Sequence, residues 1–133
     1  MKKLTQEELN EMLNSGCKDF SKMNLSGLNL REANLSEANL PRANLTEADL
    51  RGANLTEVDL TGADLTWASL VAADLTRANL TEADLTGAYL LKADLTDADL
   101  TDADLSGAFI NEKWKEYIEK CGAINPSKIQ WIK

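Results

Sequence analysis

Leucine recurs at every fifth position along most of this chain. Every position divisible by five from Leu25 to Leu105 is leucine, and Phe20 and Ile110 extend the series to nineteen centres. Two residues before the centre the chain carries alanine from position 33 to position 108, broken once by Val58. Asn or Asp usually precedes the centre and Ser or Thr usually follows it, which gives the consensus A-(D/N)-L-(S/T)-x. Self-similarity at a fixed short period indicates a repeat architecture.

Neither regular secondary structure can bury leucines at this spacing. In a helix, five residues advance by about 500°, so successive leucines would face every direction. In a straight strand, an odd period turns each leucine to the opposite face. Within one pentad, however, alanine and leucine are two residues apart and share a face. The chain must therefore turn once per pentad, and four right-angled turns close a square coil with alanine and leucine inside.

This pattern resembles the pentapeptide-repeat family over about residues 18–110. The resemblance implies an all-β solenoid, a right-handed quadrilateral β-helix with four pentads in each coil, so that nineteen centres give about five coils. It also implies that Asn and Asp before each leucine cap the turns by bonding backbone N–H groups. Cyanobacteria are especially rich in such proteins, many of which have no assigned biochemical role.

The segments outside the repeat are predicted to cover the two open ends, which would otherwise expose strand edges and leucines. Residues 1–17 form an N-terminal cap in this interpretation, because Thr5 and Glu8 make a capping box for a helix over residues 6–14. Residues 18–110 form the β-helix. Residues 111–133 supply a helix over about 112–120, ended by Gly122, and an apolar tail that packs on the last coils.

The charge of the chain argues against nucleic acid and membrane partners. The 14 basic and 22 acidic residues give a net charge of −8 and a sequence pI near 4.5, opposite to a phosphate-binding surface. No stretch is apolar for long enough to span a membrane, and the start turns acidic before an export signal could form. We therefore expect a cytoplasmic protein, although a mature chain supplied without its leader would look the same.

The residue types argue against catalysis and against a cofactor. The chain has no histidine, which is the commonest general base and metal ligand. Cys17 and Cys121 alone cannot complete a zinc site, and we expect both thiols to be reduced and partly buried. The repeat glycines occupy the last position of a pentad, where they serve turns rather than a phosphate-binding loop. We expect no enzyme activity, no cofactor and no metal.

Aspartates of successive coils are predicted to stack. With four pentads in a coil, Asp64, Asp84 and Asp104 form one column, and Asp74 and Asp94 form another. Such columns could bind a cation or imitate the charge of DNA, but we favour the interpretation that they cap turns. Stacked like charges should raise some aspartate pKa values, whereas hydrogen bonds to the ionised carboxylates act oppositely. We expect the two effects to leave a shallow pH dependence of stability.

One column of outward positions turns apolar along the solenoid axis. It starts polar beside Leu30 and Leu50 and becomes apolar beside Leu70, Leu90 and Ile110. The candidate docking surface, called the apolar patch below, consists of Trp67, Val71, Tyr89, Leu91 and Phe109. Clustered exposed apolar surface marks something that covers it. We favour coverage by residues 111–133, which carry a net charge of +2 against −9 for residues 18–110.

Two functions of different classes remain at this stage. The favoured one is a non-catalytic scaffold, a structural or protein-interaction module of unassigned role. The alternative, suggested by a branch of the family, is a DNA mimic that modulates DNA gyrase or another DNA-binding protein. About five coils is short for imitating a duplex, and basic residues interrupt the charge. A monomer is favoured over a homodimer through the apolar patch or the C-terminal segment, and the protein partner is unknown.

Overall fold

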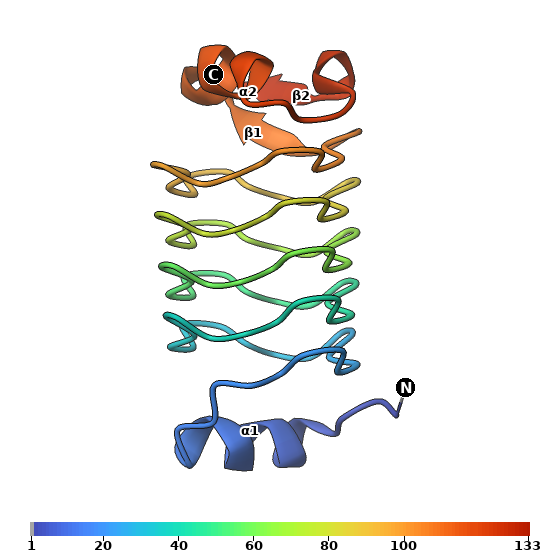
Figure 1. Cartoon of the computed structure of the whole chain (residues 1–133), viewed down its shortest axis with the longest axis vertical. Helices are drawn as coiled ribbons and strands as arrows, with labels where there is room; N and C mark the ends of the chain where they lie inside the picture. Colours follow the sequence, from blue (N-terminus) through green and yellow to red (C-terminus); the bar gives the residue numbers. More distant parts are fainter. Residues whose placement is uncertain (1) are drawn as a thin grey trace.

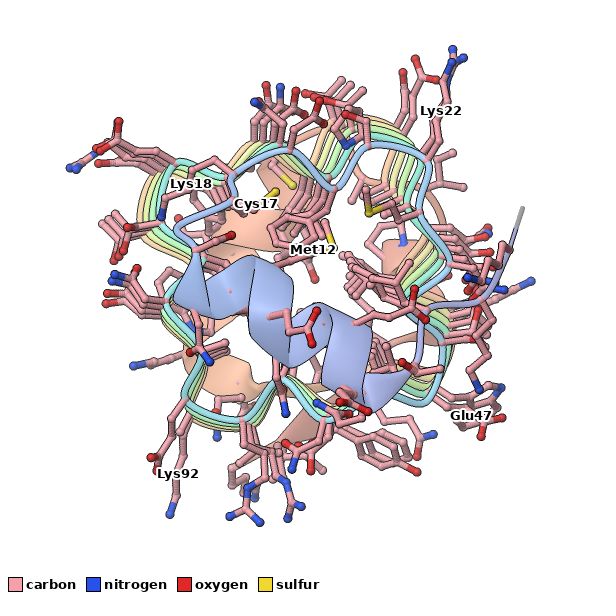
Figure 2. All side chains as sticks on the ribbon, turned by 90° about the horizontal axis from the view of Figure 1, so that it is seen from below. Met12, Cys17, Lys18, Lys22, Glu47 and Lys92 are labelled. Atoms are coloured by element: carbon pink, nitrogen blue, oxygen red, sulfur yellow. The ribbon has the colours of Figure 1, made fainter. Side chains whose placement is uncertain are left out.

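The computed structural model describes residues 2–133 as a stack of square coils with a helix at one end and a folded tail at the other (Figure 1). Residue 1 of the predicted N-terminal cap lies outside the described residues. Parallel bridges join residues twenty apart, such as Asp64 with Asp84 and Ser69 with Tyr89. Four pentads therefore complete one turn of the solenoid, and the square outline is visible along the axis in Figure 2.

Leucine and alanine fill the interior as the period predicted. The leucines from Leu25 to Leu105 that centre the pentads are at most 1% exposed, and Phe20 and Ile110 are fully buried. The alanines from Ala38 to Ala108 on the same face are equally enclosed. Each buried leucine contributes roughly 1.5–3 kcal/mol of transfer free energy. The inward and outward assignment made from the sequence is thus confirmed.

Four of the five backbone N–H groups in a pentad find backbone acceptors, as residues 73–77 illustrate. Leu75 and Arg77 donate to carbonyls of the following coil at 2.8 and 2.9 Å. Asp74 donates to the preceding coil at 3.0 Å, and the N–H of Ala73 closes the turn that precedes the pentad. The last residue of every pentad from Lys22 to Gly107 has a φ of 57 to 69°, as a type II turn requires.

The fifth N–H belongs to the Ser or Thr after leucine, and its acceptor is a side chain. The N–H of Thr101 donates to Oδ1 of Asp99 at 3.0 Å, and its hydroxyl donates to the same oxygen at 2.6 Å. Asparagine serves equally, since Asn79 accepts from the N–H of Thr81 at 3.1 Å. The prediction that these residues cap turns is therefore confirmed.

These hydrogen bonds lower the pKa values of several capping aspartates. The hydroxyl of Thr101, followed by its N–H, lowers the pKa of Asp99. The pKa values of Asp19, Asp74 and Asp104 are lowered in the same way by a Ser or Thr two residues on. The expectation of raised pKa values is wrong for these groups, because donors within hydrogen-bond distance outweigh the repulsion between exposed carboxylates.

The N-terminal helix covers the first coil. Helix α1 (Gln6–Asn14) follows Thr5, whose side chain accepts from the N–H of Glu8 while the Glu8 carboxylate accepts from the N–H of Thr5. Leu9 is the fully buried residue of α1 and joins the core. In Figure 2, α1 crosses the square diagonally beneath the coils.

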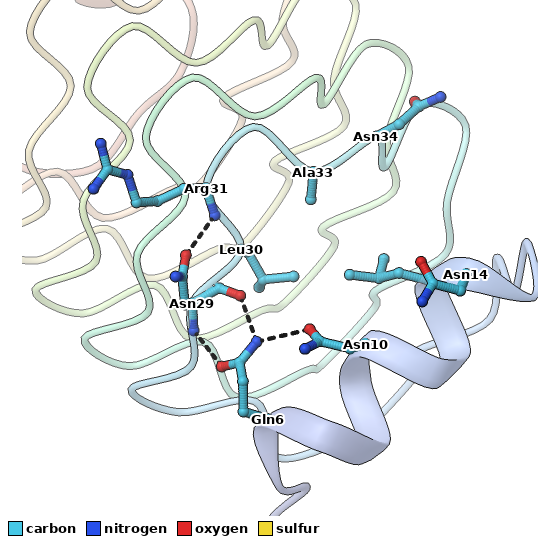
Figure 3. Close-up of a pocket in the computed structure, with 9 residues that line it drawn as sticks. Gln6, Asn10, Asn14, Asn29, Leu30, Arg31, Ala33 and Asn34 are labelled. Carbon is cyan, nitrogen blue, oxygen red and sulfur yellow. Dashed lines mark hydrogen bonds between the residues drawn. The ribbon is translucent and has the colours of Figure 1, made fainter.

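The first coil has no coil before it, and the side chain of Gln6 provides the hydrogen bonds that such a coil would have made to Asn29. The Gln6 amide nitrogen donates to the carbonyl of Asn29 at 2.8 Å, and its oxygen accepts from the N–H of Asn29 at 2.8 Å (Figure 3). On the neighbouring side, Lys3 bridges Asn24, and Leu4 donates to the Asn24 carbonyl at 3.0 Å. These contacts satisfy edge groups that would otherwise invite pairing with another chain.

The C-terminal segment continues the solenoid in an irregular form. Strand β1 (Phe109–Asn111) pairs in parallel with β2 (Gln130–Ile132). Between them lie a 3₁₀ turn (Glu112–Trp114), helix α2 (Lys115–Lys120) and a second 3₁₀ turn (Pro126–Lys128). The predicted helix over 112–120 is therefore split into two helical types.

This segment lies on the end of the last coil and not along the side of the solenoid. Ile118 is fully buried, Ile124 bridges Asp104, and the N–H of Gly107 donates to the Lys128 carbonyl at 2.9 Å. Trp67 stays 50% exposed. The expectation that residues 111–133 cover the apolar patch is thus wrong, because the unpaired backbone of the last coil binds the tail instead.

We predict that core and surface substitutions differ strongly in cost. Leu70→Ala should lower the free energy of unfolding by about 2–5 kcal/mol, since it removes a fully buried side chain and leaves a cavity. Thr76→Ala should cost about 1 kcal/mol or less, because it removes an outward side chain and keeps the N–H bond to Asp74. Urea unfolding of both variants measures the difference, and equal losses would contradict the assignment.

We also predict that stability falls on acidification. An aspartate whose pKa is lower in the folded state stabilises the fold above its unfolded pKa, and this contribution is lost as pH drops through the folded pKa. Asp99→Asn keeps an acceptor for Thr101 and removes the titration. The variant should therefore lose less stability than the wild type between pH 7 and about pH 3 in urea unfolding. A wild type that gains stability over this range would contradict the argument.

Candidate interaction surface

The five residues of the apolar patch lie together on one side of the square. This side runs between the corner of Glu47 and the corner of Lys92 in Figure 2. Successive bridges join Ser69 to Tyr89 and Tyr89 to Phe109, so these positions stand directly above one another. Trp67 and Tyr89 are 50% and 39% exposed, and the other three patch residues are half-buried.

Coil stacking brings two aromatic rings face to face. The rings of Tyr89 and Phe109 have centroids 5.0 Å apart and planes inclined by 2°. This separation is close to the spacing of paired strands, about 4.8 Å. The parallel rings therefore follow from the repeat itself and form an aromatic stack along this side.

Trp67 lies over a glycine of the next coil, a residue that sequence reasoning had assigned only to a turn. A Cβ built on Gly87 would stand 2.5 Å from the indole ring of Trp67. Gly87 also has a φ of +68° and is buried. The indole of Trp67 therefore packs against Gly87, which has no side chain to displace it. The sequence indicates this contact by placing a glycine twenty residues, or one coil, after a tryptophan.

The apolar patch lies where the Asp or Asn residues that cap the turns are replaced by other residues. On the same side of earlier coils, Asp49 accepts from the N–H of Arg51 at 3.2 Å. Further along, Ser69 and Tyr89 stand at the capping position, and the described chain offers no acceptor for the N–H of Val71 or that of Leu91. Side chains that satisfy the backbone elsewhere are replaced here by an apolar surface.

Several corner positions of this side carry no charge, although Lys92 remains charged. Ala72, Gly87 and Gly107 occupy corner positions that carry charged residues in many other pentads. Arg51 and Asp49, 2.7 Å apart, mark the N-terminal border, and the hydrogen bond from Arg51 lowers the pKa of Asp49. They line an open depression of about 490 Å³ together with Trp67, Val71 and Tyr89.

Lysines gather at the C-terminal border. Lys92, Lys113 and Lys133, called the lysine cluster below, line a second hollow of about 680 Å³ with Asn111, Glu112 and Ile132. This hollow adjoins the patch, because Lys92 follows Leu91 directly in the chain. The N–H of Lys92 donates to Oδ1 of Asn111 at 2.6 Å, which joins the two lining residues. The side is therefore apolar in its centre and cationic at one end.

No separate chemical site stands out in the rest of the described chain. Among residues 2–133, no group of three or more His, Cys, Asp or Glu residues is placed to hold a metal ion. Cys17 and Cys121 are free and half-buried, and burial raises the pKa of Cys121. No helix in the described part of the chain has the length and apolarity needed to cross a membrane.

We predict that Gly87→Ala is more harmful than Gly107→Ala. Both glycines have nearly the same φ, +68° and +69°, so both variants bear the cost of a left-handed alanine, about 1–2 kcal/mol. The nearest atom to a Cβ at Gly107 lies 3.9 Å away, so only Gly87→Ala must displace Trp67. Urea unfolding should separate the two variants, and so should the fluorescence of Trp67 in a background where Trp114 and Trp131 are replaced by Phe. Identical behaviour would show that Gly87 does not seat the indole.

Comparison with known families and structures gives a consistent result. The sequence matches the family described as pentapeptide repeats in 8 copies, over residues 19–52, 38–77 and 73–111. A solved pentapeptide-repeat protein from the Arabidopsis thaliana thylakoid lumen is 33% identical with a TM-score of 0.59, and the match covers 77% of this chain and 75% of that one. Comparison with functionally curated proteins finds no match.

Two cyanobacterial structures are also similar. Rfr23 from Cyanothece 51142 is 35% identical with a TM-score of 0.61, over 71% of this chain and 60% of that one. HetL from Nostoc sp. strain PCC 7120, described as involved in heterocyst differentiation regulation, is 34% identical with a TM-score of 0.55, over 84% of this chain and 49% of its own. The present chain thus matches less than two thirds of the length of these two proteins. From its repeats and its fold, the chain belongs to the pentapeptide-repeat family.

Proposed function

We propose that this protein is a non-catalytic scaffold of about five capped coils that binds a partner protein through the apolar patch. The observation that carries the proposal is the coincidence of three departures from the repeat on one side of the square. Turn caps and polar outward residues are given up where Trp67, Tyr89 and Phe109 stand, and four of the five corner positions from 67 to 107 on this side carry no charge, Lys92 being the exception.

Stability alone does not account for these departures. Each missing cap at Val71 and Leu91 gives up a hydrogen bond with a net value of about 1 kcal/mol. Tyr89, which stands at a capping position, remains 39% exposed, and Trp67 at the neighbouring corner remains 50% exposed. Exposed apolar groups gathered in one place are the usual mark of an interaction surface, and local conflicts with an otherwise regular fold concentrate at functional sites.

We predict that restoring the repeat removes binding and leaves the fold intact. The double variant Tyr89→Asn and Leu91→Thr returns the capping pair without changing the charge. Its free energy of unfolding should stay within about 1 kcal/mol of wild type, because a regained cap offsets the lost ring stacking. Its binding of a hydrophobic dye should fall sharply. Random peptides selected on immobilised wild type should fail to bind this variant.

A matched control places the same apolar pair on another side. Asn79→Tyr with Thr81→Leu, added to the double variant, creates an apolar pair far from Trp67 and the lysine cluster, and it should not recover peptide binding. Trp67→Glu, a change to the residue that Glu47 provides at the same corner one coil earlier, is a second variant expected to weaken binding. Selected peptides that bind wild type and double variant equally would contradict the proposal. Inhibition of DNA gyrase supercoiling by sub-micromolar protein would favour the DNA-mimic alternative.

A further inference from the structure

The side that carries the apolar patch has an uneven charge. At its N-terminal border Arg51 is paired with Asp49 at 2.7 Å, and Glu47 beside them leaves this end with a net negative charge. At its C-terminal border, none of the three residues of the lysine cluster takes part in an ion pair within residues 2–133. The arrangement is unusual for a chain whose net charge is −8.

Hydrogen-bond donors without acceptors lie along the same side. The N–H groups of Val71 and Leu91 have no acceptor in the described chain. Around the corner of Lys92, the indole N–H of Trp114 is buried without a partner among the described residues, and Trp114 lines a small hollow with Lys92, Asp94 and Lys113. An occupant rich in carboxylate and carbonyl oxygens would satisfy the N–H groups of Val71 and Leu91, and its negative charge would suit the lysine cluster.

The size of the patch argues against a second copy of the chain as the occupant. Ser69, Tyr89 and Phe109 span only two inter-coil steps of about 4.8 Å, and the side is only a few residues wide. The apolar area is therefore on the order of a few hundred Å² at most, whereas a stable interface buries about 800 Å² on each partner. A short segment with a few large side chains suits this area better than a folded surface.

We propose that the apolar patch and the lysine cluster form one docking site for a short acidic amphipathic segment of a partner protein. Bulky apolar side chains of the segment rest on Trp67, Tyr89 and Phe109, and its Asp or Glu residues lie over the lysine cluster. This proposal rests on the proposed function and adds the chemistry of the partner and its direction along the solenoid.

Synthetic labelled peptides test the charge requirement on the full chain. One probe alternates Leu, Trp and Phe with Ser and carries a block of Glu at one end, with a companion probe that carries the block at the other end. Matched probes replace Glu by Lys or the large residues by Ser. By fluorescence anisotropy in low salt, the better Glu probe should bind about tenfold more tightly than its Lys counterpart. This ratio should shrink in about 1 M salt, where screening is strong.

Variants of the chain locate the contacts. Lys92→Gln, Lys113→Gln and Lys133→Gln together should weaken the Glu probe by about five- to tenfold, and the Lys probe should bind no more weakly than before, because repulsion by the lysines is removed. Lys22→Gln, at the diagonally opposite corner in Figure 2, is the matched control and should have no effect.

The outcomes separate the two proposals. Equal binding of the Glu and Lys probes, both lost in Tyr89→Asn with Leu91→Thr, would overturn the acidic partner and leave the apolar patch as the binding surface. Glu-probe binding that survives this double variant would show attraction to lysines alone and would overturn the docking site. Failure of both probes to bind the wild type would also overturn it.

Discussion

One backbone N–H in every pentad has no backbone acceptor, and the surface of this solenoid follows from how that group is satisfied. The N–H after each leucine lies in the turn, beyond reach of the neighbouring coils, whereas the other four are paired with backbone carbonyls. An Asp or Asn two residues earlier supplies the missing oxygen, as Asp99 does for Thr101. Nine of the 22 acidic residues are aspartates at this capping position, so turn capping accounts for part of the acidity of the chain.

This constraint also decides where function can be placed. The inward positions are fixed by packing, and the residues on either side of leucine are fixed by the cap, so a regular coil leaves only its corner free. A large apolar side chain beside leucine requires that the cap be given up. Tyr89 and Leu91 do so together in one coil, and Trp67 uses a free corner above Gly87. The interaction surface is thus made by exceptions to the repeat, and not by an added loop or domain.

The sequence predicted the regular part of the fold better than its ends. A five-residue period has only one way to bury leucine, so the square coil and the patch residues could be found by counting. The position of residues 111–133 could not be predicted, because apolar area and charge favoured packing on the side of the solenoid as much as on its end. What decided was the backbone of the last coil, whose groups pair with β2 and with the Lys128 carbonyl. Every residue type except proline offers the same backbone N–H and C=O groups, so the unpaired groups of the last coil could not be recognised from the sequence.

The same reasoning links the apolar patch to the chemistry of its occupant. Removing a cap has two effects at once, since it makes room for a ring and leaves an N–H without an acceptor. A purely apolar partner would cover the rings of Tyr89 and Phe109 but would bury the N–H groups of Val71 and Leu91 unsatisfied, which costs more than leaving them in water. A partner that brings oxygen acceptors avoids that cost. An acidic amphipathic segment therefore suits this surface, because it would bring the oxygen acceptors that Asp and Asn supply to the turns elsewhere in the solenoid.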